Sequence, residues 1–154
     1  PVEFSALQRV AVRAILKSDL WFWSLSSLAP KQLLRTLLAT DPALLPRVAP
    51  EERRRAELVL QGLLPVSRKI HGLRTDGFWA GAPSLTAFDR IAVPTRILSC
   101  EDDRFGTAMT ARLLAERIPG ARLTVYPDGG HLWLGHDVDL AREITEFTAE
   151  SANN

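Results

Sequence analysis

Two short apolar runs stand in the second half of the chain, with a helical pattern between them. The first, over residues 95–100, follows a proline and has the length and composition of a buried parallel strand. Over residues 107–118 apolar side chains recur at helical spacing, and Pro119-Gly120 ends that pattern. The run over residues 123–126 predicts a second strand. A strand, helix, strand order with short connections predicts a parallel pair joined by a right-handed crossover.

The first half of the chain shows helical patterning only. Apolar positions recur at helical spacing over residues 4–16. Pro30 can occupy the first turn of a helix that runs to Leu38, and Pro50 the first turn of another that runs to Leu63. A further helix is predicted over residues 66–79. We therefore expect an all-helical region over residues 1–84 and a region with strands over residues 85–154.

A polar loop follows each predicted strand, and each loop carries a titratable side chain. Asp103 follows the first strand, and His131 follows the second in a Gly-Gly-His turn. Chemistry in open α/β sheets sits outside the carboxyl ends of the strands, and neighbouring strands lie about 5 Å apart. A carboxylate bonded to one imidazole nitrogen leaves the other nitrogen to take a proton from a nucleophile. We expect Asp103 and His131 to form such a general-base pair.

Four segments together resemble the end of an α/β-hydrolase fold protein: Pro94-Thr95, Glu101-Asp102-Asp103, Ile118-Pro119-Gly120-Ala121-Arg122 and Gly129-Gly130-His131-Leu132. The resemblance is close over residues 85–147 and loose over residues 1–84, where such enzymes insert a helical cap. It implies an α/β fold in which residues 1–84 form the cap or lid and residues 85–154 the C-terminal part of the core sheet.

The resemblance also implies a triad with the chain order Ser, Asp or Glu, His. Carried over by motif, Asp103 is the acid and His131 the base. Asp102 stands beside Asp103 and is the alternative acid. We favour Asp103 because the family acid usually stands three residues after a glycine position, which is Cys100 here.

The nucleophile is missing from this pattern. The chain contains no Gly-x-Ser-x-Gly elbow, and Cys100, at the end of a predicted strand, is typical of a buried, inert thiol. Two parallel strands are too few to be stable alone. We therefore expect the chain to be the C-terminal portion of a hydrolase that is inactive by itself. The missing N-terminal half of the same protein, or a self-associated copy, is the expected partner.

Three functions remain open. The first is a serine-type hydrolase that acts on a small apolar ester or a related carbonyl substrate. The second is a dehalogenase of the same fold, which uses an Asp nucleophile. The third is a non-catalytic interaction module whose open strand edge pairs with another chain. The acid and base could also be relics in a member of the fold that has lost its chemistry.

Aromatic residues supply the candidate substrate contacts. Trp21-Phe22-Trp23 is typical of a helix packed in a core, but three consecutive helical residues cannot all face one way. Trp21 or Trp23 could therefore face a cleft. Trp133, two residues after His131, is the stronger candidate by position.

Composition excludes several classes of protein. A net charge of +1 gives no electrostatic reason to expect nucleic acid as a partner. One cysteine cannot form an internal disulfide, which fits a cytoplasmic location. The sequence contains no run of about 18 apolar residues, so it predicts no membrane span, and the start lacks a signal-peptide pattern. No zinc-like Cys or His framework occurs, so we expect no metal and no cofactor.

Overall fold

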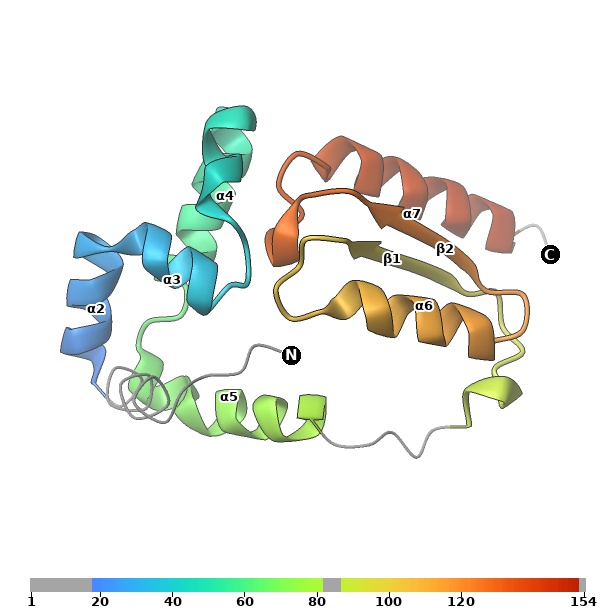
Figure 1. Ribbon diagram of the computed structural model, residues 1–154, viewed down its shortest axis with the longest axis horizontal. Coiled ribbons are helices and arrows are strands. Elements are labelled where there is room, and N and C mark those ends of the chain that lie inside the picture. Colours follow the sequence, from blue (N-terminus) through green and yellow to red (C-terminus); the bar gives the residue numbers. More distant parts are fainter. Residues whose placement is uncertain (1–17, 82–86, 153–154) are drawn as a thin grey trace.

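The computed structural model describes residues 18–81 and 87–152 (Figure 1). The helix predicted over residues 4–16 lies outside these residues. The described elements, with 3₁₀ segments labelled η, follow in chain order: α2 (Asp19–Leu28), α3 (Pro30–Thr36), η1 (Pro42–Arg47), α4 (Pro50–Gln61), α5 (Val66–Gly81), η2 (Phe88–Arg90), β1 (Arg96–Cys100), α6 (Thr107–Arg117), β2 (Arg122–Tyr126), η3 (Gly130–Leu132) and α7 (Asp137–Ala152).

The two predicted strands form a parallel pair. Arg96 lies opposite Arg122, and Cys100 lies opposite Tyr126. Helix α6 connects β1 to β2, and α6 and α7 lie on either side of the strand pair (Figure 1). Both strands therefore end at the same edge of the sheet, where the two polar loops begin. The predicted strand, helix, strand unit is confirmed.

Prolines and caps set the starts of the helices that precede the sheet. Pro30 and Pro50 occupy the first turns of α3 and α4, where their missing N–H groups leave no bond unmade. Ser18 caps α2 through its side chain. Helix α3 ends at Thr36 rather than at the predicted Leu38, and the chain then turns through Ala39, whose φ of 46° lies in the left-handed region.

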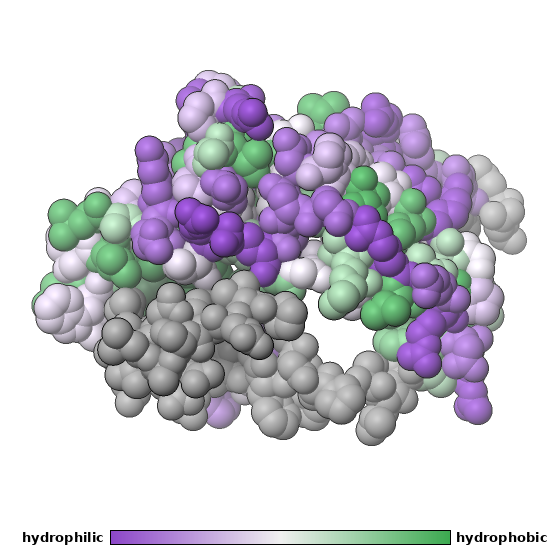
Figure 2. All heavy atoms as spheres, viewed as in Figure 1, coloured by the Kyte–Doolittle hydropathy of each residue, from purple (hydrophilic) through white to green (hydrophobic). Residues whose placement is uncertain are grey.

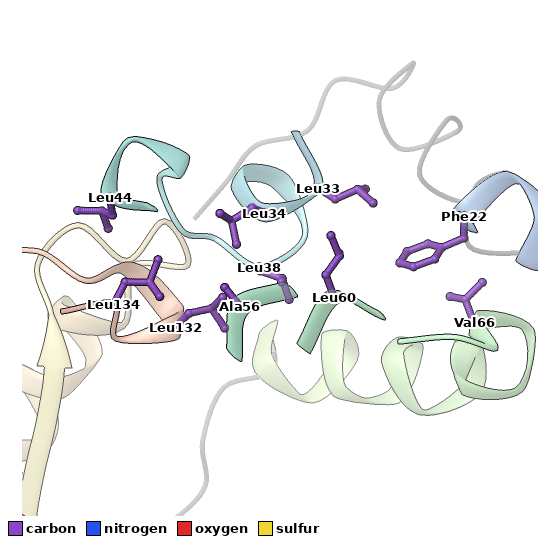
Figure 3. Close-up of a cluster of buried hydrophobic side chains, with 10 residues drawn as sticks. All are labelled: Phe22, Leu33, Leu34, Leu38, Leu44, Ala56, Leu60, Val66, Leu132 and Leu134. Carbon is purple, nitrogen blue, oxygen red and sulfur yellow. The ribbon is translucent and has the colours of Figure 1, made fainter. Parts of the chain in front are cut away.

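One apolar core joins the helices to the loop after β2. Figure 3 shows Phe22 and Val66 at one end of this cluster and Leu132 and Leu134 at the other. The remaining buried members come from α3, α4 and the turns beside them: Leu33, Leu34, Leu38, Leu44, Ala56 and Leu60. Because Leu132 directly follows His131, the position of that histidine depends on the packing of the helices.

The surface is mixed in character. Figure 2 shows polar side chains across much of this face and apolar side chains at the end that α2 occupies. Leu20 and Leu28 of that helix are largely exposed. Within the described residues, no helix combines the length and the apolarity needed to cross a membrane.

Candidate active site

The loop after β1 holds Asp103 buried and fully bonded. Its Oδ1 atom accepts a hydrogen bond from the backbone N–H of Phe105 at 2.9 Å, and its Oδ2 atom accepts one from Thr107 Oγ1 at 2.6 Å. Its side chain is 5% exposed. Charge-assisted hydrogen bonds of this kind stabilise an ionised carboxylate away from water.

Two hydroxyl groups form a chain of hydrogen bonds that ends at Asp103. Thr107, the first residue of α6, donates its single hydroxyl proton to Asp103, so Ser99 donates to Thr107 Oγ1 at 3.0 Å. Ser99 lies in β1 and is 2% exposed. The strand and the helix thus both fix the orientation of the acid.

The loop after β2 depends on two glycines with positive φ. Gly129 has φ 121° and Gly130 has φ 61°. A Cβ atom at Gly130 would come within 2.8 Å of three atoms of Thr40, so only glycine fits there. The Gly130 N–H donates to Asp102 Oδ1 at 2.8 Å. Asp102 therefore binds the backbone of this loop, while its neighbour binds the histidine.

Asp103 and His131 meet as the sequence predicts. The distance from His131 Nδ1 to Asp103 Oδ2 is 3.0 Å. Because an ionised carboxylate only accepts hydrogen bonds, the Nδ1 atom carries the proton and Nε2 keeps its lone pair. In the described part of the chain, Nε2 has no hydrogen-bond partner, and the His131 side chain is 45% exposed. The pair has the geometry of a general base, and the contact favours Asp103 over Asp102 as its acid.

An aromatic edge completes the surroundings of the imidazole. Phe105 makes a T-shaped contact with His131, with ring centroids 4.8 Å apart. Phe105 is 46% exposed, so it stands beside the histidine at the surface. This contact restricts rotation of the imidazole without occupying Nε2.

Negative charge gathers at the end of β1. Burial, with a smaller contribution from the nearby carboxylates of Asp102, Asp103 and Asp128, raises the pKa of the Cys100 thiol to about 12. The thiol is therefore a poor nucleophile in the folded protein. Cys100 is buried and protonated, as predicted for an inert thiol.

Arg55 of α4 forms hydrogen bonds with the loop after β2, which carries His131. Its guanidinium donates to the Leu132 carbonyl at 2.8 Å and forms two hydrogen bonds with Asp137, at 2.5 and 3.2 Å. Glu52, one turn earlier, accepts from the Gly135 N–H. The charged start of α4 is therefore partly an anchor for the loop that carries His131.

The three candidate tryptophans lie in different places. Trp133 packs edge-on against Tyr126 of β2, with ring centroids 6.0 Å apart. Trp21 and Trp23 are 67% and 56% exposed on α2, the helix farthest from the strands in Figure 1. Trp23 lines a cavity of about 430 Å³ that includes neither Asp103 nor His131. The described residues do not bring Trp21 and Trp23 to the acid–base pair, and their role in substrate binding stays a prediction.

His136 follows His131 too closely in sequence to be predicted as an independent base, and the structure places it at the base of the loop after β2. Its Nε2 atom lies 3.0 Å from the Asp128 carbonyl, its Nδ1 atom lies 3.5 Å from Asp139 Oδ2, and its ring packs on Tyr126. Its side chain is 14% exposed. The spacing of His136 and Asp139 at the start of an amphipathic segment is the only sequence signal for this cluster.

Comparison with known proteins identifies the family of this chain. Residues 4–143 match the model of the Alpha/beta hydrolase family, and the chain belongs to that family. The predicted α/β fold class is thereby confirmed. No curated protein and no solved structure matches the chain significantly. Within the described ranges, no three His, Cys, Asp or Glu side chains cluster as metal ligands would.

Proposed function

We propose that this chain supplies the acid and the base of a serine-type α/β hydrolase, with Asp103 as the acid and His131 as the base. The contact between His131 Nδ1 and Asp103 Oδ2 at 3.0 Å carries the proposal. Family membership supports hydrolysis as the class of reaction. The His131 side chain is 45% exposed, and among the described residues Nε2 has no hydrogen-bond partner that would compete with a nucleophile.

The chemistry follows from the state of the two nitrogens. A serine Oγ attacks a carbonyl carbon while Nε2 takes the hydroxyl proton, and the new positive charge is stabilised by Asp103. The imidazolium then returns the proton to the departing alkoxide, which leaves an acyl-enzyme. Water attacks the acyl group in the second half of the reaction, with the same nitrogen first taking and then returning a proton.

The nucleophile is proposed to come from outside these 154 residues. The sequence has no Gly-x-Ser-x-Gly elbow, and Nε2 has no partner among the described residues. The outer edge of β1 is also unpaired in the described sheet, where a further strand of the same sheet could pair. The partner that supplies the nucleophile is then the N-terminal half of the same protein, whereas a self-associated copy could only cover the open strand edge. The proposed substrate is a small apolar ester or related carbonyl compound.

The test uses the product of the intact reading frame and p-nitrophenyl esters of increasing chain length. His131→Ala and Asp103→Asn should each lower kcat by about 10³- to 10⁴-fold, which is the usual loss for a triad member. The matched control is His71→Ala, because His71 is an exposed histidine on α5. The 154-residue chain alone should show no turnover. Full ester activity in His131→Ala would refute the assignment.

Two other outcomes would assign a different function. Halide release from haloalkanes without ester turnover would indicate the dehalogenase chemistry of the same fold. A folded intact protein without either activity would indicate a non-catalytic module, and light scattering would then show whether the β1 edge pairs with a second chain. The unpaired edge of β1 is the observation that favours the non-catalytic module as an alternative function.

A further inference from the structure

One turn in the helical half of the chain, which comprises helices α2 to α5, contacts both loops that carry the acid–base pair. This turn, Ala39 and Thr40, joins α3 to η1. The Ala39 carbonyl accepts a hydrogen bond from the Arg104 N–H at 3.2 Å, and Thr40 Oγ1 accepts one from the Leu132 N–H at 3.1 Å. Each donor directly follows a member of the pair in sequence, because Arg104 follows Asp103 and Leu132 follows His131.

The hydroxyl of Thr40 is a polar group that is buried away from water. Thr40 is 0% exposed, and its hydroxyl donates to the Leu38 carbonyl at 2.8 Å while it accepts from Leu132. Both hydroxyl functions are therefore used, as a buried polar group requires. The Leu132 N–H is buried as well, and the described structure offers it no other acceptor.

The backbone around Thr40 is held in a sparsely populated conformation. Ala39 has φ 46°, which residues other than glycine adopt rarely and only where the surroundings over-determine it. The Cα, Cγ2 and Oγ1 atoms of Thr40 lie so close to Gly130 that a Cβ there would stand 2.8 Å from each. Thr40 thus contacts the residue before His131 by packing and the residue after it by a hydrogen bond.

We propose that Thr40 is a positioning residue, which fixes the distance and orientation of His131 relative to Asp103 and couples both to the helical half. This inference rests on the proposed function, in which the pair is the general base. Without the hydroxyl, the Leu132 N–H loses its acceptor and the loop shifts to find another. A displacement of about 1 Å at a reacting group lowers rates by about 10²-fold.

The test compares Thr40→Val, which keeps the branched shape and removes the hydroxyl, with Thr40→Ser, which keeps the hydroxyl. Thr36→Val is the matched control, because the Thr36 hydroxyl bonds only to Gln32 within α3. Two readouts are taken on the intact protein: kcat and KM with a p-nitrophenyl ester, and the downfield proton resonance of His131 Nδ1–H in its bond to Asp103.

Thr40→Val should lower kcat by about 10- to 100-fold with little change in KM, and should broaden or shift the downfield resonance. Thr40→Ser should restore most of both signals, and Thr36→Val should change neither. A Thr40→Val protein with unchanged kcat and an unchanged resonance would overturn the proposal. So would a Thr40→Ser protein as impaired as Thr40→Val, because packing rather than the hydroxyl would then matter.

Failure of the proposed function is distinguishable from failure of this inference. If the intact protein turns over no ester, the resonance still reports whether Thr40 holds the pair together. If Thr40→Val does not fold, Thr40→Ala removes the same hydroxyl with a smaller side chain. Failure of both to fold, with Thr40→Ser folded, would assign Thr40 to the core alone and contradict a positioning role.

Discussion

Gly130→Ala tests the contact between the helical half and the loop that carries His131. Gly130 has φ 61°, and a left-handed backbone costs a residue with a Cβ about 1–2 kcal/mol. The added Cβ would also stand 2.8 Å from Thr40 Cα, Cγ2 and Oγ1. Because one of these atoms is backbone, rotation of the Thr40 side chain cannot relieve the overlap. Overpacking of this kind adds about 1–3 kcal/mol.

The expected net loss is therefore about 2–4 kcal/mol in the free energy of unfolding. The lower entropy of the unfolded alanine chain offsets about 0.4–1 kcal/mol of the gross penalty. With a urea dependence of about 2 kcal/mol per molar, the unfolding midpoint should fall by about 1–2 M. Circular dichroism in urea measures both quantities.

Gly120→Ala is the matched control. Gly120 has φ 73°, and a Cβ there meets nothing within 4 Å, so this variant carries the backbone strain without the overlap. Its expected loss is about 1 kcal/mol. The difference between the two variants measures the contact with Thr40. Equal losses in Gly130→Ala and Gly120→Ala would refute the close packing described for the two segments.

Two further predictions concern the surroundings of the pair. Because burial and nearby carboxylates raise the pKa of Cys100 to about 12, the folded protein should react with iodoacetamide at pH 9 far more slowly than the urea-unfolded protein. The unfolded thiol, with a pKa near 9.0, releases its proton first, so the free energy of unfolding should fall between pH 9 and 12, and Cys100→Ala should lack this component. Arg55→Ala should lower the free energy of unfolding by about 1–2 kcal/mol, because it breaks bonds to Leu132 and Asp137 that are partly exposed to solvent. Arg54→Ala, which removes only an exposed ion pair, should change it by less than about 0.5 kcal/mol, and a larger loss there than in Arg55→Ala would contradict the anchoring role.

The strand pair and the meeting of Asp103 with His131 could be predicted from sequence because both depend on local patterns. A short apolar run and its polar loop specify a strand and its carboxyl end, and parallel pairing then brings the two loops to one edge. The helix starts at Pro30 and Pro50 were predicted from sequence signals that are equally local. The end of α3 differed by two residues because the turn at Ala39 is imposed by its contacts with the loops after the strands.

The supports of the pair could not be predicted because they join segments far apart in sequence. No pattern near Thr40 or Arg55 indicates a bond to Leu132, and the hydroxyl of Ser99 carries no signal for its role beneath Thr107. Helix α7 is not among the predicted elements, although the structure begins it at Asp137 with acidic residues in its first turn. Tertiary contacts of this kind become visible only when the fold is known.

The contact between Thr40 and Leu132 also has a consequence for the order in which the chain folds. It links residues 92 apart in sequence, whereas Asp103 and His131 are 28 apart. Closing the longer loop costs about 1 kcal/mol more in chain entropy, and contacts between distant residues form late in folding. We expect Asp103 and His131 to approach each other first. Their geometry should become fixed only when the helices before the sheet pack against the loop after β2. The resonance of the His131 proton would then report the last step of folding, and a newly made chain would acquire a competent base only after its most distant segments had met.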